Sequence, residues 1–272
     1  MKTRKGDMAL SALPTPTIQT AVHLPRTPWW GAWSGFLIVG CFYVTQAVGI
    51  SIVQLVATLG MGNSSGVDGA SALDQTWFLP MSLLAGTIGG ALVALRVAAS
   101  RAKLKKDSEW VWEFIWQSYD VRRLWRFVFL GLGLGLGFFS LTEYGVLPPD
   151  DLPQPIFDAL LAASVLLQLV WILMFVVLFP VIEEILFRGI LLTGLTQSWG
   201  PILAAIVTTA LFVAVHMPKV LEYWPALVAV ICIGALAVVL RIRTGSLAPG
   251  IVMHCAYNGT LVTAAFLPTS VS

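Results

Sequence analysis

Two adjacent glutamates and an arginine lie inside an otherwise apolar stretch of the chain, between Phe179 and Leu192. At membrane depth an ionised side chain costs at least about 2.5–3.5 kcal/mol, so such residues are kept only where they pair or line a wet cavity. Glu184 and Arg188 are four residues apart and share one face of a helix, which predicts an ion pair. Glu183 points about 100° away from Glu184 and has no partner on its helix. A general base that activates water needs this freedom.

Two of the three histidines lie in or at the ends of apolar runs in the same half of the chain. His216 ends the run from Phe212, and His254 opens the run to Asn258. Because His254 and Asn258 are four residues apart, their polar groups leave a helix on the same face. Two donor groups aimed the same way, in the same half of the chain as a carboxylate suited to a general base, favour a chemical site over isolated packing residues. The alternative is an architectural charge cluster that holds helices together.

The composition of the 272-residue chain places these residues in a membrane. Hydrophobic residues make up 57% of the chain, charged residues make up 11%, and the mean hydropathy is +0.84. Soluble domains carry about 25% charged residues, so a water-soluble fold is excluded. At about 20 residues per crossing there is room for about seven spanning helices. We predict an all-α, polytopic integral membrane protein with seven or eight transmembrane helices.

Other classes of protein are excluded by charge and by the cysteines. A net charge of +2 without a basic stripe argues against nucleic acid as a partner. Cys41, Cys232 and Cys255 are far apart in sequence, which argues against a disulfide framework and against a Cys-rich metal site. Cys255 also points about 100° away from the face of His254 and Asn258, which disfavours a thiol nucleophile.

The apolar stretches predict the elements that must position these residues. The four glycines over 131–137 are interpreted as close helix packing rather than a nucleotide loop, because no strand precedes them. The first four predicted spans are Trp33–Leu59, Trp77–Ala99, Phe127–Leu147 and Leu160–Phe179, followed by helical stretches at Ile182–Gln197, Pro201–His216, Pro225–Leu240 and Leu247–Leu267.

The distribution of lysine and arginine along the chain predicts how the protein is oriented in the membrane. They are frequent in the N-terminal tail and in the stretch 101–126, but absent from the loops 60–76 and 148–155. This pattern predicts a cytosolic N-terminus. The stretch 101–126 also contains aromatic and apolar residues, so it either lies along the membrane surface or forms a solvated basic loop.

Three motifs in this order resemble the CAAX prenyl protease and bacteriocin-processing family of intramembrane proteases, which includes the type II CAAX prenyl endopeptidases. The resemblance covers residues 160–265. The first 150 residues carry no family signal beyond hydrophobicity. Charge and hydrophobicity predict a cytosolic tail over 1–30 and first transmembrane helices, with the charged loop 101–126, over 31–150. The resemblance implies a CAAX-protease-like catalytic transmembrane domain over 151–272. The motifs are Glu-Glu-x-x-x-Arg at Glu183, Glu184 and Arg188, Phe-x-x-x-His at Phe212 and His216, and His-x-x-x-Asn at His254 and Asn258, the last preceded by Gly245-Ser246-Leu247 and Pro249-Gly250.

The resemblance implies a role for each motif residue. Glu183 activates a water that attacks a peptide carbonyl, and His216 helps to bind or polarise that water. His254 and Asn258 stabilise the oxyanion. The supporting residues are Glu184 and Arg188 as an ion pair, and Phe212, which orients the turn of His216.

The resemblance leaves the metal open, since the family is often labelled metalloprotease. Two histidines and a glutamate can ligate zinc. The chain has no His-Glu-x-x-His motif, however, and the residues come from three separate helices. We therefore favour a water activated by Glu183 and His216 without a metal, and expect no cofactor.

These features predict an endopeptidase acting on a lipidated, CAAX-type or membrane-bound peptide, with its four catalytic side chains around one cavity that opens towards the cytosol. A non-catalytic scaffold or bacteriocin-immunity-type protein is the first alternative, but it has no need of all four residues. A transporter that uses the carboxylates as a proton relay is the second. The absence of an inverted repeat disfavours it.

Overall fold

The structure is a computed structural model that describes residues 31–61, 70–102, 119–144, 160–220 and 223–266. All regular elements within these ranges are helices, which confirms the all-α prediction. Outside the long run that carries the two glutamates, the helices are α1 (Ala32–Met61), α2 (Ala70–Ala102), the short 3₁₀ helix η2 (Val121–Arg123), α4 (Trp125–Tyr144), α9 (Pro201–Val220), α10 (Trp224–Thr244) and α11 (Ala248–Ala265).

The two glutamates lie in one unbroken helical run of 35 residues, Val165–Trp199. The prediction of two helices separated near Pro180 is therefore wrong. Pro180 lies inside this run, just after a π-helical turn (Met174–Leu178), so its missing N–H leaves one carbonyl oxygen of that turn without a helical donor. The run consists of α6 (Val165–Leu173), the π-helix η3 (Met174–Leu178), α7 (Phe179–Glu184), the π-helix η4 (Ile185–Leu191) and α8 (Leu192–Trp199).

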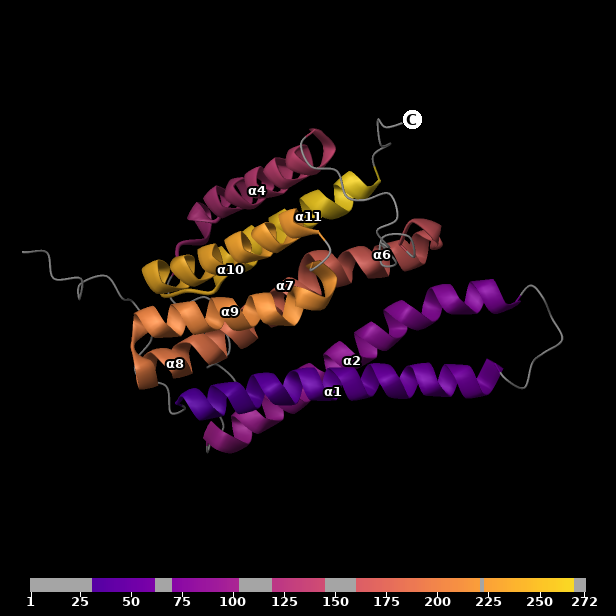
Figure 1. The fold of residues 1–272 in the computed structure, drawn as a ribbon, viewed down its shortest axis with the longest axis horizontal. Coiled ribbons are helices and arrows are strands. Elements are labelled where there is room, and N and C mark those ends of the chain that lie inside the picture. Colours follow the sequence, from indigo (N-terminus) through magenta and orange to yellow (C-terminus); the bar gives the residue numbers. More distant parts are fainter. Residues whose placement is uncertain (1–30, 62–69, 103–118, 145–159, 221–222, 267–272) are drawn as a thin grey trace, which may run out of the picture.

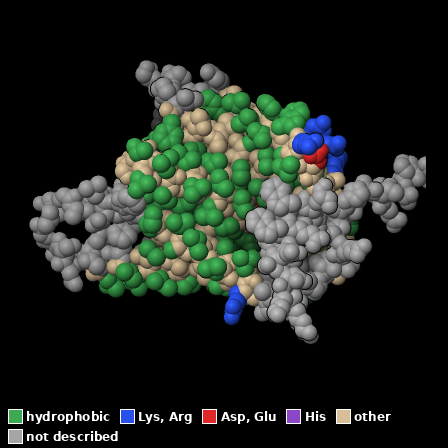
Figure 2. All heavy atoms as spheres, turned by 180° about the vertical axis from the view of Figure 1, so that it is seen from behind, with side chains coloured by type: hydrophobic (Ala, Val, Ile, Leu, Met, Phe, Trp, Pro, Cys, Tyr) green, Lys and Arg blue, Asp and Glu red, His purple; other side chains and the backbone are tan. Residues whose placement is uncertain are grey.

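Five helical stretches in the described part of the chain are long and apolar enough to cross a membrane. They are Ala32–Val53, Pro80–Val97, Val121–Thr142, Val165–Trp199 and Trp224–Thr244. The predicted count of seven or eight is not confirmed, in part because two predicted helices join into one run. Figure 2 shows an apolar surface with charged side chains only at its margins, as expected for a multi-pass membrane protein.

The helices are arranged around the long run (Figure 1). α4 packs along α11, and α9, α10 and α11 follow one another as neighbours. The predicted close packing is present at two of the four glycines of α4: a Cβ at Gly131 would meet the carbonyl oxygen of Met253, and one at Gly135 would lie 2.6 Å from Thr260. A Cβ at Gly133 or Gly137 would meet nothing within 4 Å. On the other side, α1 pairs with α2 and contacts η4 and α8.

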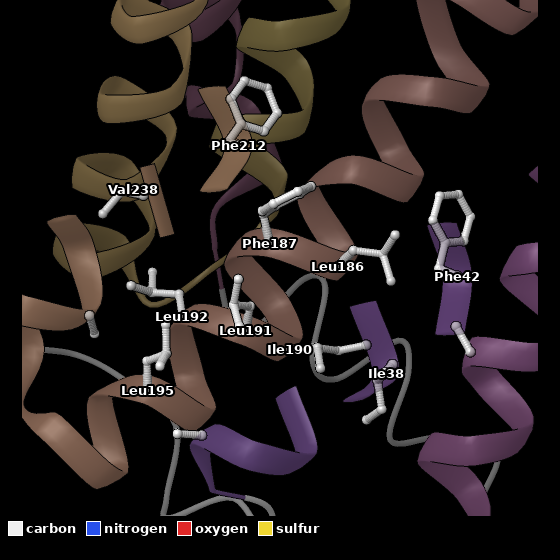
Figure 3. Close-up of a cluster of buried hydrophobic side chains, with 13 residues drawn as sticks. Ile38, Phe42, Leu186, Phe187, Ile190, Leu191, Leu192, Leu195, Phe212 and Val238 are labelled. Carbon is white, nitrogen blue, oxygen red and sulfur yellow. The ribbon is translucent and has the colours of Figure 1, made fainter. Parts of the chain in front are cut away.

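The main apolar core joins α1 to the motif-bearing helices (Figure 3). Ile38 and Phe42 of α1 are buried in the same cluster as Phe187 of η4 and Phe212 of α9. The core thus holds the first helix directly against the turn that follows the two glutamates.

Several predictions fall on residues that the structure does not describe. These predictions concern the whole tail 1–30, most of the charged stretch 101–126, the whole loop 148–155 and part of the loop 60–76. The orientation of the N-terminus and the boundaries of the three predicted regions remain predictions.

Candidate active site

Glu184 forms the buried half of the glutamate pair. It has no exposed surface, and its Oε1 accepts hydrogen bonds from Arg188 Nη1 and from His254 Nδ1, each at 3.1 Å. The predicted ion pair with Arg188 is therefore present. Among the described residues, Oε2 has no hydrogen-bond partner. A Cβ on Gly250 would lie 3.0 Å from this oxygen, so a glycine gives α11 its close approach to Glu184.

Arg188 is as buried as Glu184 and connects three helices. Its Nη2 donates to the carbonyl oxygen of Gly234 in α10 at 2.8 Å. Its Cζ lies 4.3 Å from the centre of the Phe212 ring in α9, a cation–π contact. The guanidinium is thus compensated by a carboxylate, a carbonyl and an aromatic face, as a charge without access to water requires.

Glu183 faces the two histidines. Its side chain is 20% exposed; Oε1 lies 3.8 Å from His216 Nε2 and Oε2 lies 3.9 Å from His254 Nε2. These distances are too long for direct hydrogen bonds but short enough for one water to bind two of the groups. The structure therefore brings together Glu183, His216 and His254 from three separate helices.

The contact that Nδ1 makes in each histidine determines which ring nitrogen carries the hydrogen. His216 Nδ1 lies 2.7 Å from the carbonyl oxygen of Phe212, and His254 Nδ1 lies 3.1 Å from Glu184 Oε1. Carbonyl and carboxylate oxygens only accept, so Nδ1 is the donor in both rings. In a neutral imidazole the Nε2 that faces Glu183 is then an acceptor. The three facing groups require a hydrogen-bond donor between them, and a water molecule supplies two.

Asn258 has a different immediate contact from the other three predicted catalytic residues. Its Nδ2 donates to the carbonyl oxygen of Phe175 at 2.8 Å. Phe175 lies in the π-helix η3, where each carbonyl accepts from the N–H five residues later. For Phe175 that residue is Pro180, which has no N–H. Asn258 thus supplies the donor that the proline lacks and has a second amide hydrogen for other use.

Phe212 packs at the centre of the cluster, consistent with its predicted orienting role. Its ring centre lies 5.2 Å from that of Phe187, 4.5 Å from that of His216 and 6.1 Å from that of His254. It also supplies the carbonyl that orients His216. One residue therefore fixes both the position and the tautomer of a histidine on the next turn.

A metal ion would need a closer set of ligands. Within the described ranges, no group of three or more His, Cys, Asp and Glu side chains is placed to hold a metal ion. Ligands of tetrahedral zinc lie about 2.0–2.2 Å from the metal, so neighbouring ligand atoms must approach one another to about 3.4 Å. Glu183 and the two Nε2 atoms, at 3.8 and 3.9 Å, fit zinc only after moving inward.

Two contributors were not foreseen from the sequence. Gly234 accepts from Arg188, and a Cβ there would lie 3.0 Å from Phe212. Phe175 contributes through its backbone alone. A glycine within an apolar helix and a proline five residues after Phe175 are the only sequence signals for these contacts.

One comparison with known proteins finds a match, and the match covers the helices of this site. Residues 165–260 match the family model described as type II CAAX prenyl endopeptidase Rce1-like. No curated protein and no solved structure matches the chain. The matched residues begin with α6 and end within α11, so they contain all three motifs, whereas α1, α2 and α4 lie outside them. Proteases of this family act on prenylated proteins in membranes. The segment 165–260 thus matches the model of the Rce1-like type II CAAX prenyl endopeptidases, which confirms the resemblance seen in its motifs.

Proposed function

We propose that the protein is an intramembrane endopeptidase that cleaves a peptide bond near the C-terminus of a prenylated, CAAX-type protein. One observation carries the proposal: in the family-matched segment, the partly exposed carboxylate of Glu183 faces two histidine Nε2 atoms at 3.8 and 3.9 Å. Neither a scaffold nor an ion pair needs a carboxylate and two imidazole nitrogens around space for a water molecule.

In this mechanism Glu183 and His216 bind the attacking water. The water donates one hydrogen to Glu183 and one to His216 Nε2, which leaves an oxygen lone pair for the substrate carbonyl. As the new carbon–oxygen bond forms, Glu183 takes the proton. It returns that proton to the amine that leaves when the peptide bond breaks.

His254 and Asn258 stabilise the oxyanion. His254 donates Nδ1–H to Glu184, so a second donor at Nε2 requires the doubly protonated imidazolium. Glu183, Glu184 and Arg188 together carry one net negative charge, which an imidazolium at His254 balances. Asn258 contributes the amide hydrogen that Phe175 does not use. Pre-aimed donors of this kind are worth about 10²–10³ in rate.

The cleavage experiment uses the full chain, purified in detergent, with a library of peptides that end in a prenylated cysteine box. We expect cleavage by the wild-type protein and none by Glu183→Ala, with unprenylated peptides of the same sequence as the substrate control. A wild-type protein that is folded yet cleaves none of the peptides would favour the non-catalytic alternative.

We further propose that the reaction proceeds without a metal. The expected result is that phenanthroline leaves the rate of cleavage unchanged, with metal content measured on the same active sample. Stoichiometric zinc that is lost together with activity on chelation, and restores activity when added back, would overturn the metal-free mechanism while leaving the protease assignment in place.

A further inference from the structure

Helix α1 lies outside the family-matched residues but is held in register against the motif helices. At its start, the backbone N–H of Ala32 donates to Ser198 Oγ of α8 at 3.0 Å. One turn later, a Cβ on Gly35 would lie 3.4 Å from the backbone of Leu191 in η4. These two contacts fix which residues of α1 lie beside the glutamates.

Tyr43 is the residue of α1 that this register brings to the site. Its ring centre lies 6.3 Å from that of Phe187 and 5.0 Å from that of Phe42, which meets it edge to face. Both phenylalanines are buried in the main core, and Figure 3 shows Phe42 on α1 and Phe187 on η4. The tyrosine ring is therefore held on two sides.

Phe187, which Tyr43 contacts, lies about one helical turn after Glu183 and directly before Arg188. Tyr43 therefore packs against the stretch of helix that carries both charges, and its hydroxyl lies within electrostatic range of both. No hydrogen bond joins it directly to either of these two described residues, so it acts over a longer distance or through a water. Tyr257 of α11 provides a contrast: it is buried in a second apolar cluster, with Ile233 and Met253, and not against η4. Of these two tyrosines, only Tyr43 is directed at the site.

We infer that Tyr43 is a positioning residue for Glu183, whose hydroxyl holds the carboxylate and its water in the reactive arrangement. The inference rests on the proposed function, because it assigns Tyr43 to the same hydrolytic step. A hydroxyl is suited to this role since it can donate to a carboxylate while accepting from a water. The site is then completed by a helix outside the family-matched segment.

The kinetic test compares Tyr43→Phe with Tyr257→Phe, each of which removes one hydroxyl from a ring packed in an apolar cluster. On a prenylated peptide that the wild type cleaves, we expect Tyr43→Phe to lower kcat about tenfold, the loss of one hydrogen bond to a charged group, with KM within twofold. We expect Tyr257→Phe to match the wild type. An unchanged kcat in Tyr43→Phe, or a raised KM at unchanged kcat, would overturn the inference.

A second measurement decides the inference without any activity. Thermal unfolding midpoints are measured for the wild type, Tyr43→Phe, Glu183→Ala and the double variant. We expect Tyr43→Phe to lower the midpoint by about 2 °C when Glu183 is present and to have no effect when it is absent. Equal shifts in both backgrounds would show that the hydroxyl does not act on Glu183. If the wild type cleaves no peptide, the proposed function fails, while this cycle still tests the contact.

Discussion

Glu183 and Glu184 are adjacent in sequence, yet the structure places them in opposite environments. Glu184 has no exposed surface and accepts hydrogen bonds from Arg188 and His254. Glu183 is 20% exposed, and 3.8–3.9 Å separate its oxygens from His216 and His254. The helical rotation of about 100° between neighbours produces the difference.

The comparison shows that the two glutamates of one motif have different roles: Glu184 is structural and Glu183 is placed for chemistry. A carboxylate that is fully buried must be compensated, and its partners then hold it in one position. A carboxylate that reaches water can take up a proton, which a general base requires. His254 contacts both glutamates, so it connects the structural side of the motif to the chemical side.

The largest effect is expected at the chemical side. Glu183→Gln should lower the rate of cleavage by about 10³-fold or more, because the amide cannot take a proton from water. The protein should remain folded and membrane-inserted, since Glu183 is partly exposed and its carboxylate lies too far from both histidines for direct hydrogen bonds. Cleavage rate and thermal midpoint, measured on the same sample, check both statements. A residual rate within tenfold of the wild type would remove Glu183 from the mechanism.

Asn258 sharpens the comparison because it has both a structural contact and a proposed chemical role. Asn258→Ala should lower the rate by about 10²–10³, as the loss of an oxyanion donor does. It should also lower the thermal midpoint, because the carbonyl of Phe175 loses its donor.

Pro180→Ala separates these two roles. It restores a backbone N–H within reach of Phe175, so the double variant with Asn258→Ala should regain the midpoint but not the rate. Recovery of both quantities would make Asn258 a structural residue only.

At the structural side, Glu184→Gln should chiefly reduce stability. Loss of one partner of a buried pair typically costs about 3–5 kcal/mol, which lowers the midpoint by about 10 °C. The folded protein that remains should also lose about tenfold in rate, because a neutral amide orients His254 less firmly. Equal losses of activity in Glu183→Gln and Glu184→Gln, both at an unchanged midpoint, would contradict the division of work.

The smallest effect tests the close approach of α11 to Glu184. Gly250→Ala places a methyl group 3.0 Å from Glu184 Oε2, so neighbours must shift by a few tenths of an ångström. We expect a midpoint lower by about 3–5 °C, the result of modest overpacking. Gly133→Ala is the matched control, because a Cβ at this position meets nothing within 4 Å. A midpoint equal to that of the control would show that Glu184 has room to move.

Much of the fold and part of the site follow from the sequence alone. The charge-poor composition determined that the chain is helical and membrane-embedded, since only helices and closed barrels satisfy backbone polar groups in lipid. The spacing of four determined the pair of Glu184 and Arg188, because helix geometry brings such residues together without help from the rest of the fold. The family motifs identified the candidate site residues.

The remaining contacts join residues that are far apart along the chain, and only the tertiary structure decided them. His254 reaches Glu184 over 70 positions and Asn258 reaches Phe175 over 83. No local pattern encodes these pairs, because they depend on how α11 packs against the long run. The same holds for Tyr43, whose contact with Phe187 depends on the register of α1. Local spacing determines which side chains share a helix face, whereas helix packing determines which faces meet.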